Sequence, residues 1–153
     1  MGLIGPLALA GCTGLTPVYG DNGLGAHRVQ IAYNAPNNRL EQVIYNDLSL
    51  KLGSDQGGSA AKLSVSASQR TVALTNDTVS SPALQRQMIV TAAVTLVGRD
   101  GVVLYSGALS QTADYTIGAQ AFANQEAAAN AAENAARLLA DTIRLKVLAA
   151  LVK

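Results

Sequence analysis

The chain has 153 residues, of which 49% are hydrophobic and 14% are charged, and its formal net charge is +1. This apolar content is typical of a globular domain and not of a disordered chain. Without a basic block, the chain lacks the electrostatic footprint of a nucleic-acid-binding protein, and the absence of Trp leaves few surfaces on which bases could stack. One Cys and one His, Cys12 and His27, are too few on their own for a four-ligand zinc site. We therefore expect no metal and no cofactor.

Cys12 is the only cysteine, so it cannot form a disulfide within the chain. It follows Leu9, Ala10 and Gly11, and this order of an aliphatic residue, two small residues and a cysteine resembles a bacterial lipobox. The resemblance implies that the Cys12 thiol carries a diacylglyceryl group, that a signal peptidase cleaves before it, and that the new amine is acylated. Two alternatives remain open, which are a free buried cysteine and a chance leader of small residues.

The segment before the cysteine, residues 1–11, is expected to be a signal peptide with an apolar core. A signal peptide normally starts with basic residues, whereas the first one here is Arg28, so we expect translation to start upstream of Met1. Residue 13 is Thr and not Asp, which in the sorting pattern that this resembles favours the outer membrane, on its periplasmic side.

Residues 12–25 begin with the lipidated cysteine, are rich in Gly, Pro and Asn, and are expected to form a flexible tether. Residues 26–153 have the length of a single domain. They contain no run of 18 apolar residues, so the sequence predicts a protein that a lipid anchors to the membrane and that does not cross it.

The first elements of the domain are a strand and a helix. In residues 27–33, apolar side chains alternate, which predicts a half-buried strand. In residues 39–52, the apolar side chains Leu40, Ile44 and Leu48 share one face, which predicts an amphipathic helix. An Asn at position 37 or 38 can cap its start, and Gly53 can end it.

Three more strands and a long helix follow. Residues 62–74 alternate, with a slip at Gln69-Arg70 where we expect a β-bulge. Residues 86–98 and 102–113 are predicted strands joined by a hairpin turn at Arg99-Asp100-Gly101. Residues 119–152 are rich in Ala, with polar and apolar faces at helical spacing, which predicts a long helix packed on the sheet.

The order β-α-β-β-β-α predicts an α+β fold, a two-layer sandwich of an antiparallel or mixed four-stranded sheet and two helices. The helices cover one face of such a sheet, so the other face or the edges stay free. A free sheet face or edge is a binding surface and not an active site.

Several stretches together resemble the LPS-assembly lipoprotein family, LptE, in its alphaproteobacterial form. They are the lipobox, PVYG at residues 17–20, TLVGRDGVVLYSGALSQTADYTI at 95–117 and LLADTIRLKVLAAL at 138–151. The resemblance implies a non-catalytic outer-membrane lipoprotein that sits in the lumen of an LptD-like β-barrel, the LPS translocon. Such a protein helps the barrel to assemble and plugs it, and lipopolysaccharide is a candidate ligand during insertion into the outer leaflet.

The family resemblance implies that loops and one sheet edge face the barrel. Arg70, Arg86 and Arg99 are near predicted strand ends, so they are candidates to bind lipid phosphates, although exposed arginines are common on any surface. Tyr105 and Tyr115 could pack on the barrel wall, or within the domain as such tyrosines more often do.

Two other functions are considered. A periplasm-facing lipoprotein that is an accessory subunit of a lipid-transport system would need an enclosed apolar cavity. A lipid-anchored enzyme would need a catalytic motif, and the chain has no nucleophile elbow and no paired-carboxylate motif. We therefore do not expect an enzyme.

Overall fold

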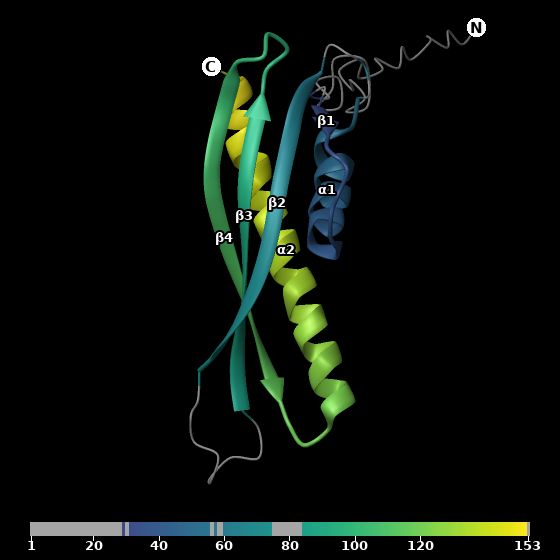
Figure 1. Cartoon of the computed structure of the whole chain (residues 1–153), viewed down its shortest axis with the longest axis vertical. Coiled ribbons are helices and arrows are strands. Elements are labelled where there is room, and N and C mark those ends of the chain that lie inside the picture. The colour runs from purple at the N-terminus through teal and green to yellow at the C-terminus, as the bar shows by residue number, and fades with distance from the viewer. Residues whose placement is uncertain (1–28, 30, 56, 58–59, 75–83, 153) are drawn as a thin grey trace, which may run out of the picture.

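A computed structural model of the chain describes residues 29, 31–55, 57, 60–74 and 84–152. The elements follow in the order β1-α1-β2-β3-β4-α2, and the four strands form one sheet in the order β1-β2-β3-β4 (Figure 1). This confirms the predicted α+β class and element order. The expected signal peptide, the tether and Cys12 lie outside the described residues.

The sheet is mixed. Strands β2 (Ala61–Ala73), β3 (Leu84–Val97) and β4 (Val103–Ile117) are antiparallel neighbours. Strand β1 (Ile31–Tyr33) runs parallel to β2 and pairs with its first three residues only. Over most of its length, the outer edge of β2 therefore has no partner among the described strands.

The predicted β-bulge at Gln69-Arg70 is wrong. Pairing between β2 and β3 is unbroken from Lys62 to Ala73, and the register shift in the sheet lies instead between Leu96 and Val97. The alternation fades at Gln69 for another reason. This side chain is on the helix side of the sheet but is exposed, because α1 covers the strand only as far as Ala67.

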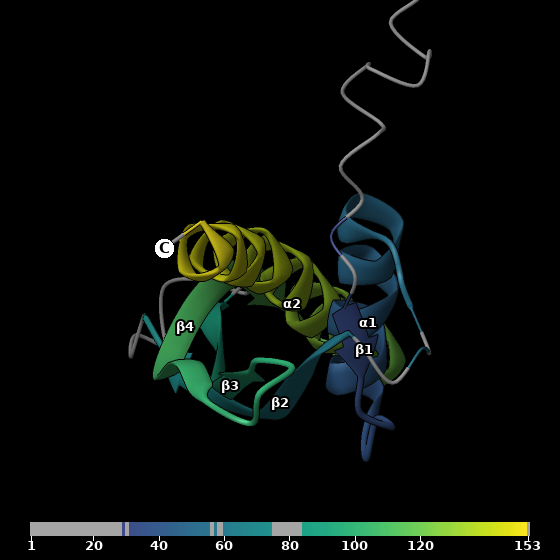
Figure 2. The same ribbon diagram turned by 90° about the horizontal axis from the view of Figure 1, so that it is seen from above.

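Both helices lie on one face of the sheet (Figure 2). Helix α1 (Arg39–Leu52) has the predicted bounds. The side chain of Asn38 caps its start by accepting a hydrogen bond from the Glu41 N–H at 3.0 Å. At its end, Gly53 adopts a φ of 88° and donates its N–H to the Ser49 carbonyl at 2.9 Å, a backbone conformation that favours glycine.

Helix α2 (Ala121–Leu151) has 31 residues, which corresponds to about 46 Å, and runs the full length of the sheet (Figure 1). Five of its eight buried residues are alanines, and such small side chains let a helix axis approach a sheet closely. The buried residues are Ala131, Ala132, Ala135, Ala136, Leu139, Ala140, Ile143 and Val147.

The core fills the space between the helices and one face of the sheet. Met88, Val90, Ala92, Val94 and Leu96 of β3 all point inward and are at most 3% exposed, as their alternation predicts. Helix α1 runs antiparallel to β2, from the level of Ala67 back toward β1. We call the end of the sandwich at which the chain enters β1 the proximal end. The turn between β3 and β4 and the C-terminal ends of both helices also lie there (Figure 1).

Adjacent leucines of α2 test this packing. Leu139 is fully buried, whereas Leu138 is 51% exposed. We expect Leu139→Ala to lower the free energy of unfolding by about 2–5 kcal/mol, because the cavity remains in a packed core. Leu138→Ala should lower it by about 0.5 kcal/mol or less. Urea unfolding followed by circular dichroism measures both, and equal losses would contradict the described orientation of α2.

Candidate functional site

The outer edge of β2 is closed near its start by side chains of α1. The N–H of Val65 donates to the Tyr45 hydroxyl at 2.7 Å, and this hydroxyl donates to the Val65 carbonyl at 3.3 Å. A single hydroxyl group thus takes the place that the main chain of a neighbouring strand would occupy.

Two residues further along β2, Asn38 and Glu41 do the same for Ala67. The Ala67 N–H donates to Oε1 of Glu41 at 3.1 Å, and the Asn38 side-chain amide donates to the Ala67 carbonyl at 3.0 Å. The other carboxylate oxygen of Glu41 accepts from the Asn37 N–H at 2.6 Å. Glu41 is 1% exposed, so it is a buried anion whose oxygens are occupied by structural donors.

Burial by itself raises the pKa of Glu41. The hydrogen bonds from the backbone N–H groups of Asn37 and Ala67 and from the side chain of Asn38 outweigh that effect, so the pKa lies below its ordinary value of 4.5. The carboxylate therefore stays ionised at neutral pH and stabilises the junction between α1 and β2.

Beyond Ala67 the edge is open. Alternate residues of a strand direct their main-chain groups to the same edge, so the N–H and C=O groups of Gln69, Thr71 and Ala73 point the same way as those of Val65 and Ala67. Within the described residues these groups have no partner. We call residues 69–73 the open edge of β2.

A surface groove of about 390 Å³ lies beside the first part of the open edge, between the start of α1 and helix α2. Leu40, Ala67 and Ala132 give it apolar walls, and Arg39 and Glu133 lie at its rim. The groove and the open edge together could accept an extended polypeptide segment, whose main chain would pair with β2.

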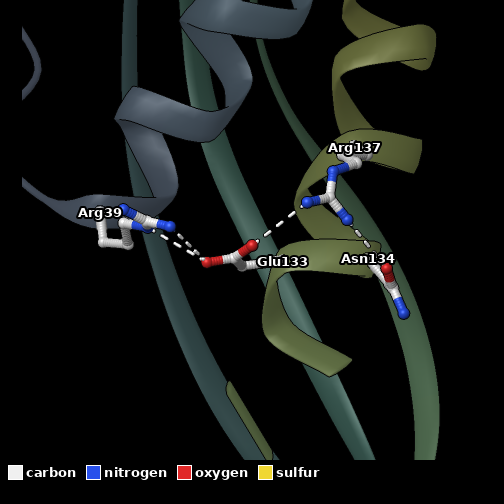
Figure 3. Close-up of polar contacts among 4 residues, drawn as sticks. All are labelled: Arg39, Glu133, Asn134 and Arg137. Carbon is white, nitrogen blue, oxygen red and sulfur yellow. Dashed lines mark hydrogen bonds and ion pairs between the residues drawn. The ribbon is translucent and has the colours of Figure 1, made fainter. Parts of the chain in front are cut away.

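Ion pairs on the surface connect the two helices at this groove. Oε1 of Glu133 accepts from Arg39 of α1 at 2.9 Å, and its other oxygen accepts from Arg137 at 3.2 Å (Figure 3). Lys51 makes a second link, to Asp141 of α2 at 2.8 Å. Hydrogen bonds from Lys51 to Asp141 and Asp47 raise the pKa of that lysine. These exposed pairs contribute little stability individually and mainly fix how α1 sits against α2.

The face of the sheet opposite the helices is rich in small and hydroxylated side chains. Among its described residues only Lys62, Arg70 and Asp114 carry a charge. Three adjacent rows across it consist of Ser64, Ser66, Ser68, Thr91, Ala93, Thr95, Ser106, Ala108 and Ser110. Such a face is polar enough to be stable in water, yet its contact with another surface would require little removal of charge from water.

The three candidate arginines do not form one cluster. Arg70 is exposed on the hydroxyl-rich face, whereas Arg86 is half-buried on the helix side, opposite Tyr115. The Nε of Arg86 is buried and has no hydrogen-bond partner in the part of the chain that the structure describes. Arg99 is exposed in the turn after β3, about 40 Å from Arg86 along that strand.

The two tyrosines of β4 are on the helix side of the sheet. Tyr105 and Tyr115 are both half-buried against the core, and the Tyr115 hydroxyl donates to the Thr71 hydroxyl at 3.4 Å. Both therefore pack within the domain, which is the second of the two alternatives that the sequence left open for them.

In the part of the chain that the structure describes, no three His, Cys, Asp or Glu side chains gather as a metal site would need. No helix there is long and apolar enough to cross a membrane. The hollows found there are on the surface, and each has a polar or charged residue on its walls. The lipid-transport alternative, in contrast, requires an enclosed apolar cavity.

Neither Glu41 nor Tyr45 was predicted from the sequence to join α1 to β2. A signal for Glu41 was present, because Asn38 and Glu41 have the spacing of a capping box, in which a carboxylate lies three residues after the cap. No local signal connects Tyr45 to Val65, which is 20 residues away.

These elements define a small α+β domain with two helices on one face of a mixed four-stranded sheet. The chain belongs to the lipopolysaccharide-assembly family, LptE, whose model matches residues 26–147. No curated protein matches its sequence.

Solved structures share the fold. A putative lipoprotein from Caulobacter crescentus is 22% identical, with a TM-score of 0.60, over 80% of this chain and 92% of that one. A minor lipoprotein from Acinetobacter baumannii is 16% identical, with a TM-score of 0.59, over 79% and 90%. The rare lipoprotein B from Shewanella oneidensis is 14% identical, with a TM-score of 0.64, over 80% and 96%.

Glu41→Gln tests the junction of α1 and β2. We expect the variant to be less stable by about 1–3 kcal/mol near neutral pH, because an amide group then faces a main-chain donor. Since the folded-state pKa is lowered, the contribution of Glu41 is present above pH 4.5 and is lost as the pH falls through the lower folded value. Urea unfolding at about pH 7 and about pH 3 should show the two proteins converging in acid. A constant difference would contradict this role.

Proposed function

We propose that this chain is a non-catalytic lipoprotein, anchored at the periplasmic side of the outer membrane, that helps an LptD-like β-barrel to assemble and plugs its lumen. The barrel would thereby support insertion of lipopolysaccharide into the outer leaflet. The observation that carries the proposal is the match of the lipopolysaccharide-assembly family over residues 26–147. On this proposal Cys12, at the end of the lipobox, carries the lipid.

The geometry supports a plug in two ways. The domain is narrow and filled, with one long helix along the whole sheet (Figure 1). Its hydroxyl-rich face has few charges to remove from water, so it can lie against the polar wall of a barrel lumen at low cost.

The open edge of β2 supplies the second contact. Strands with unpaired edges bind extended segments of other chains through main-chain hydrogen bonds. We infer that an extended segment of the barrel pairs with Gln69, Thr71 and Ala73. Direct binding of lipopolysaccharide phosphates by Arg70, Arg86 or Arg99 remains a prediction, and it would use separate contacts because the three side chains lie apart.

Co-purification tests the function. The chain, with a tag after Lys153 and its natural upstream region, is expressed in its own host, and outer membranes are solubilised in mild detergent. We expect a stoichiometric outer-membrane barrel of the lipopolysaccharide-export type by mass spectrometry. Cys12→Ala should weaken the anchoring of the chain in the membrane. Recovery alone, or with inner-membrane transporter subunits, would contradict the proposal and favour the lipid-transport alternative.

Two variants of one residue test the open edge. Gln69→Pro removes the side chain and the outward N–H, whereas Gln69→Ala removes the side chain only. We expect the proline variant to recover about two- to tenfold less barrel, since a main-chain hydrogen bond contributes about 0.5–1.5 kcal/mol. Proline is tolerated on edge strands, and thermal unfolding checks that both variants fold. Equal recovery with the two variants would exclude the edge as a contact.

A further inference from the structure

Exposed apolar side chains gather at the proximal end. Nine large apolar side chains are exposed among the described residues, and five of them are at this end. Three are consecutive where the hairpin turn enters β4, where Val102 and Val103 are each 55% exposed and Leu104 is 39% exposed. The other two are Val152, which follows α2 and is 86% exposed, and Leu50 in the last turn of α1, which is 85% exposed. Single exposed apolar residues are ordinary, but three consecutive ones at the tip of one hairpin indicate a binding surface.

The hairpin turn holds its valines outward. The Gly98 N–H donates to the Val102 carbonyl at 2.8 Å, and the Val102 N–H donates to Oδ1 of Asp100 at 3.1 Å. Gly101 has a φ of 81°, which suits this tight turn. The turn is thus a hydrogen-bonded projection.

Basic residues lie around this apolar cluster. Arg99 in the turn and Lys62 at the start of β2 are exposed, and neither forms an ion pair in the described ranges. The carboxylates of Asp100 and Asp55 instead accept N–H groups of their own turns, from Val102 and Gly57. Apolar side chains with cations beside them match a membrane surface, in which anionic headgroups border the acyl region.

The position of this end in the chain points to the same occupant. The described chain begins at Val29, which packs against the core at the proximal end. Only 16 residues separate it from Cys12. As the flexible tether that the sequence predicts, they would span about 20–24 Å on average, which is about half the length of α2. A lipid on Cys12 would therefore hold the proximal end close to the membrane.

We propose that the proximal end is a membrane-contact surface, in which Val102, Val103 and Leu104 enter the boundary between headgroups and acyl chains and Arg99 lies at the headgroup phosphates. This inference rests on the lipid anchor of the proposed function. It concerns the folded domain before a barrel encloses it, because the wall of a barrel separates a domain in its lumen from lipid.

Tryptophan fluorescence tests the contact, because the chain has no Trp. Val103→Trp places a single Trp at the proximal end, and Phe122→Trp places one at the start of α2, where the native side chain is 76% exposed. The lipidated full chain is reconstituted in vesicles of phosphatidylethanolamine and phosphatidylglycerol, with and without brominated acyl chains. We expect the Val103→Trp variant to lose roughly half of its Trp emission, since interfacial side chains settle about 5–10 Å deep. The Phe122→Trp variant should lose none.

The outcomes separate this inference from the anchor. If the chain does not float with the vesicles, the lipid anchor fails. If it floats but the Val103→Trp variant is not quenched, or if both variants are quenched equally, the membrane-contact surface is wrong. Quenching by iodide in the aqueous phase distinguishes a protein contact from a lipid contact. If the Trp of the Val103→Trp variant is shielded from iodide only in the complex with the barrel, the proximal end contacts the barrel and not the membrane. Val102→Trp repeats the measurement should Val103→Trp fail to fold.

Discussion

Helix α1 is joined to the sheet through the main chain of β2 as well as through packing. The Tyr45 hydroxyl and the Glu41 carboxylate satisfy N–H groups of β2 that would otherwise be buried without partners, and an unsatisfied buried group is costly. This junction fixes where α1 begins over the sheet. It thereby also fixes the point along β2 beyond which α1 no longer covers the strand. The positions of the open edge and of the groove follow from that point.

The second constraint is the small size of the α2 side chains. Because alanines line its buried face, α2 lies close to β3 and β4. Close packing of this kind suits a protein that acts through its surfaces. The surfaces are of three kinds: a face rich in hydroxyl groups, an unpaired strand edge and an apolar end.

Local patterns in the sequence were enough to predict most of the fold. The bounds of α1 and the inward side chains of β3 followed from periodicity and capping. The bulge at Gln69 was mispredicted because a loss of alternation has two causes, an extra residue or missing cover, and only the tertiary structure separates them. The site was less predictable. Glu41 meets Ala67 across 26 residues, and only the folded sheet places the apolar residues of the β3–β4 hairpin at the end where the chain enters β1.

The length of α2 has a consequence for a protein set upright in a membrane. Its 31 residues span about 46 Å, whereas the hydrocarbon core of a bilayer is about 30 Å thick. A domain standing on its proximal end inside a barrel would therefore extend past both boundaries of the hydrocarbon layer. The length of α2 would then determine how far the domain reaches across the membrane. Its far end would lie at the level of the opposite headgroups without any segment of its own chain crossing lipid.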